Sequence, residues 1–372
     1  MSSPHCARRG LGGRREIVRG PDHEKGRVGL LGCSANGYRS WVTSSLPVAV
    51  GGLSEIVVEA LLDGVGPPSM GLDSVDGDPL DHDLQLALYV LNELHFAGWV
   101  GVDDDLEWNP AVTALRCKLN DEFERRLRHT LPPSLSSPTA EARRLLDLPG
   151  PSVSKYLRDH GTVEQVRESM ILRSAYQSKE ADPHTFAVPR FAGSTKRVLT
   201  EIQSGEYGVG HKRSHAELFA DALIGLDLDP TPNAHIDNCT GPSLAISNLV
   251  TLGAMQRRLR GVVLGQLSLF EMDSVVPNQR MVDCCDRLDL DERVRPFFAI
   301  HVLADAEHQV MVEASFLVEY PRIHPRQVHN LLLGMRAQSL IDHATARTSV
   351  PNWQHDRSAL SVVPSPAIRQ AS

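Results

Sequence analysis

One short segment in the C-terminal third of the sequence places three metal-binding side chains on a common helical face. It reads His301-Val-Leu-Ala-Asp305-Ala-Glu-His308, with the spacing H-x3-D-x2-H. Positions i, i+4 and i+7 of an α-helix face the same side. Two imidazoles and a carboxylate that converge in this way suit redox-active first-row metals, and zinc would accept them too. The pattern therefore predicts a metal site, against the alternative of a solvated polar stripe.

Other carboxylates and histidines on neighbouring predicted helices strengthen this prediction. Glu271 follows an apolar run at 262–270, where an acid is costly unless it is paired or bound to metal. Bundles that hold two metal ions use inward-facing carboxylates and histidines from several helices. Four carboxylates and three imidazoles are candidates here, a set that suits two ferrous ions. The candidate ligands are Glu180, Glu206, His215, Glu271, His301, Asp305 and His308.

The spacing of apolar residues predicts that the chain is helical throughout. They recur three and four positions apart between Pro or Gly residues, and almost nothing resembles a strand. Gly98 and Pro277 are expected to follow helix ends. The predicted helices span 52–63, 79–98, 107–130, 138–147, 162–180, 189–204, 212–226, 240–273, 292–315 and 325–345. The expected fold class is an all-α helical bundle.

Composition divides the chain into one helical domain and two extensions. Residues 1–45 are rich in Gly, Arg and Ser without sustained periodicity, so we expect a disordered or weakly ordered extension there. Residues 347–372 are expected to form a similar disordered tail. The helical domain is predicted at 46–346, with its metal-binding core at about 160–315.

The charge balance and the cysteines constrain partners and location. With 38 basic and 46 acidic residues the net charge is −8, so the chain lacks the broad basic field that attracts nucleic acid or a membrane surface. Neither is expected as a partner, and no signal peptide or membrane span is visible. The six cysteines form no CxxC pair, and adjacent Cys284 and Cys285 are poorly placed for an ordinary disulfide. A cytoplasmic location is therefore predicted.

Between about residue 93 and residue 308 the sequence resembles the haem-oxygenase-like di-iron oxidases and oxygenases, often described as iron-containing redox enzymes. The last core helix of that family carries H-x3-D-x2-H, which His301, Asp305 and His308 match. Its preceding helix carries a glutamate about thirty residues earlier, which Glu271 matches. The resemblance implies a haem-oxygenase-like helical bundle.

The earlier part of the family pattern is also matched. Glu180 corresponds to the glutamate of the first core helix. Glu206 and His215 correspond to a glutamate followed by a histidine on a helix. The interval between these two varies among relatives, and Glu201 and Glu217 are alternative acids near this histidine.

The resemblance implies an O2-activating non-haem di-iron oxidase or oxygenase. Members bind two irons in place of haem and oxidise small amine, amino-acid or fatty-acid-like substrates. The implied reactions are N-hydroxylation, desaturation and oxidative carbon–carbon cleavage. Two iron ions (Fe2+/Fe3+), O2 as co-substrate, a small-molecule substrate and an external electron donor are therefore expected. The sequence also resembles relatives that form dimers, so a homodimer stays open for this chain.

Two other functions stay open as alternatives. The same residues could belong to a non-catalytic helical protein that binds or senses iron, which steady substrate turnover with O2 would exclude. A haem-binding oxygenase would need an axial histidine near the first core helix, and His95 is the attractive candidate. The cluster of acids argues against haem. For Glu93 and His95 we favour a core-facing helix with a buried, hydrogen-bonded histidine over a role as ligands.

Overall fold

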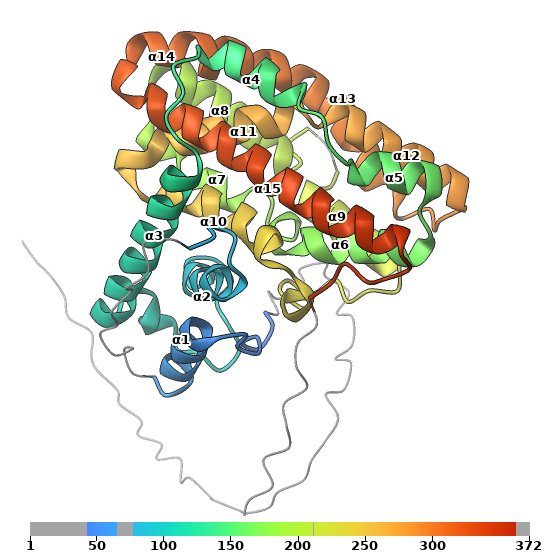
Figure 1. The fold of residues 1–372 in the computed structure, drawn as a ribbon, viewed down its shortest axis with the longest axis horizontal. Helices are drawn as coiled ribbons and strands as arrows, with labels where there is room; N and C mark the ends of the chain where they lie inside the picture. Colours follow the sequence, from blue (N-terminus) through green and yellow to red (C-terminus); the bar gives the residue numbers. More distant parts are fainter. Residues whose placement is uncertain (1–42, 65–76, 211, 362–372) are drawn as a thin grey trace, which may run out of the picture. The chain divides into compact units, whose positions relative to one another are not determined.

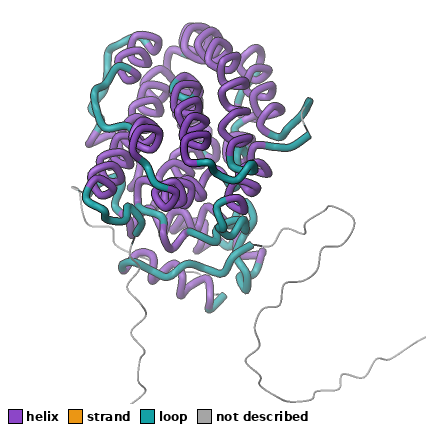
Figure 2. Tube along the Cα trace, turned by 90° about the vertical axis from the view of Figure 1, so that its right-hand side faces the viewer, coloured by secondary structure: helices purple, strands orange, loops and turns teal. Residues whose placement is uncertain are grey.

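The computed structural model describes residues 43–64, 77–210 and 212–361. Within these ranges the regular elements are helices, and the sole strand-like feature is a bridge between Ser45 and Val100. Figure 2 shows the helices joined by loops, with no strand among the described residues. The predicted all-α, haem-oxygenase-like helical bundle is confirmed.

The helices vary in length from short turns to the long C-terminal helix. The α-helices are α1 (Gly52–Leu62), α2 (His82–Glu93), α3 (Pro110–Thr130), α4 (Pro138–Leu146), α5 (Val153–His160), α6 (Val163–Gln177), α7 (Asp182–Thr185), α8 (Gly193–Glu206), α9 (His215–Gly225), α10 (Gly241–Met255), α11 (Arg260–Met272), α12 (Val275–Leu288), α13 (Arg295–Val312), α14 (Tyr320–Ile323) and α15 (Val328–Gln354). The short 3-10 helices are η1 (Asp104–Trp108), η2 (Val188–Arg190), η3 (Ile236–Asn238), η4 (Arg257–Leu259) and η6 (Pro325–Gln327), and η5 (Glu313–Glu319) is a π-helix.

Helix α2 lies inside the N-terminal part of the bundle. Every residue of 84–93 is buried, and α1, α3 and α10 all pack against this helix (Figure 1). Its start is fixed by Asp81, whose side chain accepts a hydrogen bond from the backbone N–H of Leu84. The neighbouring Asp83 accepts hydrogen bonds from the backbone N–H groups at the start of α1. These contacts tie the first two helices together.

Glycines bring α11 and α15 into close contact. A Cβ atom at Gly265 would overlap the backbone oxygen of Leu331, and one at Gly334 would overlap that of Val262. Figure 1 shows α15 as the long helix that crosses the drawn face of the bundle. The absence of side chains at these two positions therefore sets the distance between the helices. This packing holds α11 in place, and α11 carries Glu271.

The predicted helix at 240–273 is wrong as a single helix. Helix α10 ends at Met255, and α11 begins at Arg260 after the turn η4. Gln256 between them has an extended backbone, with φ −100° and ψ 106°. One extended residue reverses the chain and lets the two apolar helices pack against each other. Hydrophobic spacing continues across such a break, so the sequence pattern does not reveal it.

Two α-helices of eight residues or more were not predicted. Helix α12 occupies the segment that Pro277 was expected to leave as a loop. Pro277 lies in the first turn of α12, where its missing N–H costs no intrahelical hydrogen bond. Helix α5 is short and begins at Ser152, whose hydroxyl accepts a hydrogen bond from the N–H of Lys155.

The C-terminal end of the domain lies beyond residue 346. Helix α15 continues to Gln354, so residues 347–354 are helical, in contrast to the disordered tail predicted from 347. The indole of Trp353 and the N–H of Ala359 both donate to the carboxylate of Glu168, at 2.7 and 2.8 Å. The expectations for residues 1–42 and 362–372 lie outside the described residues.

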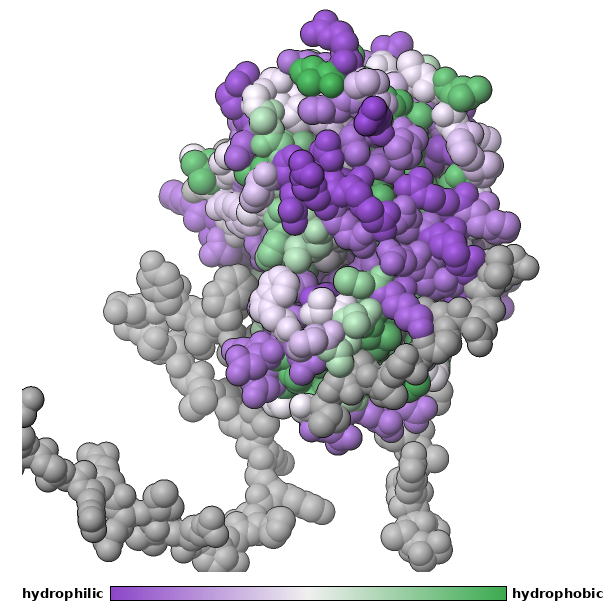
Figure 3. Space-filling model, turned by 90° about the vertical axis from the view of Figure 1, so that its left-hand side faces the viewer, coloured by the Kyte–Doolittle hydropathy of each residue, from purple (hydrophilic) through white to green (hydrophobic). Residues whose placement is uncertain are grey.

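None of the described helices is long and apolar enough to cross a membrane. The face drawn in Figure 3 is mostly hydrophilic where it is described, with hydrophobic groups between the polar ones.

Candidate metal centre

The structure brings all seven predicted ligand residues together in the interior of the bundle. They form two groups of four, and in each group one ligand atom per residue lies within 4.8 Å of the others. All seven side chains are buried. The first group consists of Glu180, Glu206, His215 and His301, and the second of Glu206, Glu271, Asp305 and His308. Glu206 belongs to both groups.

Helix α13 supplies one side chain to the first group and two to the second. His301, Asp305 and His308 are buried on one face, as the spacing predicted. On the same helix Leu303 is 72% exposed and Val310 is 65% exposed. Phe297 and Phe298 at the start of the helix are buried, but between residues 301 and 310 these three polar side chains point inward and the two apolar ones outward, so hydrophobic packing alone does not order this segment. This arrangement indicates that the inward polar face has a function.

Glu206 and His215 lie where two consecutive helices meet. Glu206 is the last residue of α8, where the negative end of the helix dipole makes a carboxylate unfavourable without a cation. His215 is the first residue of α9, whose start is fixed by a capping box between Ser214 and Glu217. Glu217 is exposed and engaged in this cap, and Glu201 is exposed on α8. Neither alternative acid joins the groups.

The remaining two carboxylates lie close to helix ends. Glu180 follows α6 and lies beside Gln177. With its amide nitrogen turned toward the carboxylate, Gln177 donates to Oε1 of Glu180 at 3.2 Å. Glu271 lies in the last turn of α11. Both helices therefore present an acid from their C-terminal ends.

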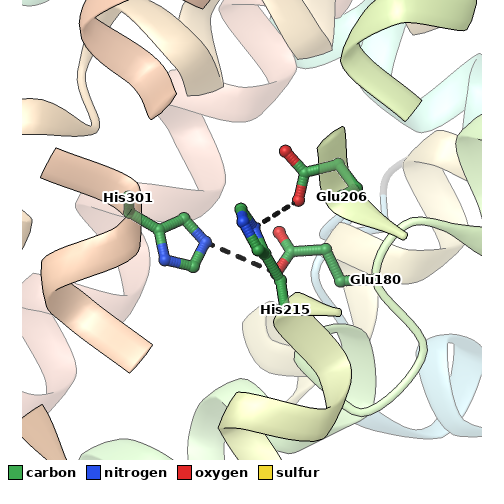
Figure 4. Close-up of side chains that lie close together, drawn as sticks. All are labelled: Glu180, Glu206, His215 and His301. Atoms are coloured by element: carbon green, nitrogen blue, oxygen red, sulfur yellow. Dashed lines mark ion pairs between the residues drawn. The ribbon is translucent and has the colours of Figure 1, made fainter. Parts of the chain in front are cut away.

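The first group contains three buried polar atoms that converge without hydrogen bonds between them. Nδ1 of His215 lies 2.5 Å from Oε2 of Glu206, and Nε2 of His301 lies 3.6 Å from Oε2 of Glu180 (Figure 4). These two ring nitrogens and Oε2 of Glu206 have no hydrogen-bond partner among the described residues. Buried polar atoms in folded proteins are nearly always paired. A cation bound between these atoms would satisfy all three, so the side chains fit a metal ion.

The second group is arranged around His308. Its Nδ1 lies 3.2 Å from Oε2 of Glu271, 3.5 Å from Oδ1 of Asp305 and 3.9 Å from Oε1 of Glu206. Glu206 thus turns Oε1 toward the second group and Oε2 toward the first. A carboxylate in this position can bridge two metal ions.

Burial and neighbouring charges shift the pKa values of the candidate ligands. Burial raises the pKa of Glu180, and it raises the pKa of Glu271 to about 8. For His301 burial lowers the pKa, but the nearby carboxylates, Glu180 foremost, outweigh it and raise the pKa to about 10. The pKa of His308 is also raised to about 10, against burial, by Asp305 and Glu271. Positive charge is therefore strongly favoured among these acids.

Neighbouring groups orient the candidate ligands. Nδ1 of His301 lies 2.7 Å from the backbone oxygen of Phe297, which places a proton on Nδ1 and leaves Nε2 free to bind a metal. The hydroxyl of Ser274 donates to Asp305, and Asn278 donates to Ser274 at 2.8 Å. Ser274 and Asn278 were not predicted, because the sequence pattern does not indicate α12. Their i, i+4 spacing would have placed them on one helical face.

Glu93 and His95 lie outside both groups. Nδ1 of His95 lies 2.7 Å from the carboxylate of Glu107, and Glu93 forms a buried ion pair with Lys179. The preference for a buried, hydrogen-bonded His95 is confirmed.

Comparison with protein families identifies one match, and no curated protein matches the chain. The family is described as iron-containing redox enzyme, and its model covers residues 167–343. This segment contains every member of both groups of candidate ligands. Over residues 167–343 the chain is therefore similar to the iron-containing redox enzymes.

Proposed function

We propose that this chain is an O2-activating, non-haem di-iron oxidase or oxygenase. The observation that carries the proposal is the pair of buried four-residue groups that share the carboxylate of Glu206. The family match over residues 167–343 supports an iron-dependent redox enzyme. Two adjacent groups joined by one carboxylate support two metal ions.

The chemistry of the side chains favours iron. Both groups offer only imidazole nitrogens and carboxylate oxygens, a donor set that suits ferrous iron. The four carboxylates carry four negative charges, which two Fe2+ ions would neutralise. When bound, the ferrous ions would supply electrons and open coordination positions for O2.

The protein's own residues would hold, orient and shield this centre. Phe297 fixes the ring of His301 through its carbonyl, and Ser274 fixes the carboxylate of Asp305. All seven candidate ligands are buried, which keeps bulk water away from them. A prearranged set of ligands loses little conformational entropy when the metal binds.

The proposal extends to the reactants that the family resemblance implies. A small amine, amino-acid or fatty-acid-like substrate would undergo N-hydroxylation, desaturation or oxidative carbon–carbon cleavage. An external electron donor would restore Fe(II), as O2 chemistry at two irons requires. We also propose a cytoplasmic location, which the absence of CxxC pairs supports, and a homodimer.

The proposal is tested by loading the metal-free protein with Fe(II) without air and measuring iron content and O2 consumption. His301→Ala and Glu271→Ala each remove a candidate ligand, one from each group, and should lower both quantities. Glu201→Ala and His355→Ala change exposed residues outside the groups and serve as controls. Unchanged iron content and O2 consumption in both ligand variants would overturn the proposal. Iron binding without O2 consumption would instead favour the non-catalytic iron-binding function.

A further inference from the structure

A chain of hydrogen-bonded side chains runs from the interior of the bundle to its surface. The hydroxyl of Tyr176 lies 3.0 Å from Nδ1 of His184, and Nε2 of this histidine lies 2.8 Å from Oε1 of Gln266. Gln266 donates to Gln338 at 2.9 Å. Gln338 in turn donates to both carboxylate oxygens of Asp342, each at 2.9 Å. The first four side chains are buried and Asp342 is exposed.

The two glutamine amides set the direction of the hydrogen bonds in this chain. Gln338 turns its NH2 group toward the carboxyl group of Asp342 and its oxygen toward Gln266. Gln266 must then donate to Gln338 and accept from His184. His184 therefore carries its proton on Nε2, and its Nδ1 is free to accept the proton of Tyr176. These positions define a tyrosine that is hydrogen-bonded to a neutral imidazole, because burial lowers the pKa of His184 to about 4.

Tyr176 lies beside the candidate metal centre. It precedes Glu180 by four residues, and its ring packs edge-on against Phe270 with 5.8 Å between ring centroids. Phe270 directly precedes Glu271. Burial, and then the charges of Glu180, Glu206 and Glu271, raise the pKa of Tyr176 well above its usual value. The hydroxyl of Tyr176 therefore stays protonated close to candidate ligands from both groups.

We propose that Tyr176 is a redox-active tyrosine that donates one electron to the iron centre after that centre has reacted with O2. This inference rests on the proposed function. The O–H bond of Tyr176 breaks, and the proton forms an N–H bond with Nδ1 of His184. Tyr176 becomes a neutral radical, His184 becomes an imidazolium, and the iron centre is reduced by one electron. The Oε1 atom of Gln266 stabilises the imidazolium by accepting a hydrogen bond from its Nε2–H group.

The coupling of proton and electron follows from burial. Loss of the electron alone would leave a cation radical in the interior, and loss of the proton alone would leave a buried phenolate. A hydrogen-bonded base lets both leave together. Tyr89, which is also buried, has no histidine partner: its hydroxyl contacts the amide oxygen of Asn233 and the backbone oxygen of Ala175, and it accepts a hydrogen bond from Lys179 at 3.2 Å.

The direct test is electron paramagnetic resonance of Fe(II)-loaded protein, frozen at intervals after mixing with O2. We expect the signal of a neutral tyrosyl radical, which narrows when the tyrosines carry ring deuterium. Tyr176→Phe should abolish the signal while iron content stays unchanged. Tyr320→Phe changes another buried tyrosine outside the hydrogen-bonded chain and should retain the signal. His184→Gln keeps a polar partner without a base and should also abolish the signal.

A second measurement needs no iron. Nitrogen-15 NMR of the metal-free protein should show His184 as the neutral Nε2–H tautomer, and an Nδ1–H tautomer would overturn the proposed direction of the chain. In the loaded protein, a radical that persists in Tyr176→Phe, or iron binding and O2 consumption without a tyrosyl radical, would overturn this inference and leave the proposed function standing. Failure to bind iron would overturn both.

Discussion

Nδ1 of His215 lies 2.5 Å from Oε2 of Glu206, yet neither atom has a hydrogen-bond partner among the described residues. The lone pairs of two such atoms repel each other unless positive charge lies between or beside them. The pair joins the end of α8 to the start of α9. Glu206 also faces His308 of the second group. Its carboxylate therefore interacts with candidate ligands of both groups.

Replacement of Glu206 should affect iron binding more than replacement of any other candidate ligand. Glu206→Ala removes a carboxylate from both groups, so we expect loss of most bound iron from an expected two per chain. Glu271→Ala changes only the second group and should leave about one iron per chain. Iron is counted after anaerobic loading and gel filtration. Glu201→Ala is the matched control on α8. Equal iron loss in the Glu206 and Glu271 variants would contradict a bridging role.

Ser274 should contribute to metal affinity without being a ligand. Ser274→Ala removes the hydrogen bond that orients Asp305, and loss of such a partner typically lowers metal affinity about 10–100-fold. Competition with a metal-binding dye measures this change. Ser349→Ala, a buried serine on α15, should leave the affinity unchanged. An unchanged affinity in Ser274→Ala would show that Asp305 needs no support from α12.

Iron should stabilise the folded chain, because the ligand groups assemble only when the helices are in place. At an Fe(II) concentration 100 times the Kd, we expect a gain of about 2.7 kcal/mol in the free energy of unfolding. Anaerobic thermal unfolding should show a higher Tm with Fe(II), and a chelator should reverse the shift. His301→Ala changes only the first group and should lose part of this shift. A full shift in this variant would place iron elsewhere on the chain.

The close packing of α11 against α15 should be needed both for stability and for iron binding. A methyl group at Gly265 would overlap the backbone of Leu331, so Gly265→Ala should cost about 1–3 kcal/mol of stability. The displaced α11 should also lower iron content, since it carries Glu271. Gly52→Ala, where no atom lies within 4 Å of the added Cβ, is the control. Urea unfolding and iron counting measure both effects. Normal stability together with normal iron content in Gly265→Ala would disprove this link.

The buried ion pair of Lys179 and Glu93 should be sensitive to the loss of either partner. Their side chains are 8% and 1% exposed. Lys179→Met leaves Glu93 unpaired in the interior, which should cost about 3–5 kcal/mol. Adding Glu93→Gln removes the unpaired charge and should restore much of that loss. A double-mutant cycle by urea unfolding measures the coupling, and additive effects would show that the pair is not energetically coupled.

The sequence predicted the candidate ligands better than it predicted the helices that carry them. His301, Asp305 and His308 were recognisable because their spacing is local and matches the helical period. Glu206 and His215 lie on different helices, and it was the family resemblance that paired them. The sharing of Glu206 between two groups could not be predicted, because it depends on the positions of α8, α9, α11 and α13 in space.

The errors in the fold have local causes. Gln256 breaks an apolar pattern that continues on both sides, and Pro277 occupies the one turn of a helix that tolerates proline. Both features depend on backbone geometry at single residues, to which hydrophobic spacing is insensitive. Because α12 was not predicted, Ser274, which donates a hydrogen bond to Asp305, was not recognised either.

We propose that two irons bind between these seven side chains and react with O2. The most direct test of this proposal is anaerobic reconstitution with Fe(II), with iron counted per chain, followed by stopped-flow absorbance on mixing with O2. We expect about two irons per chain and a transient visible absorption band. One iron or none, with a featureless trace, would contradict it.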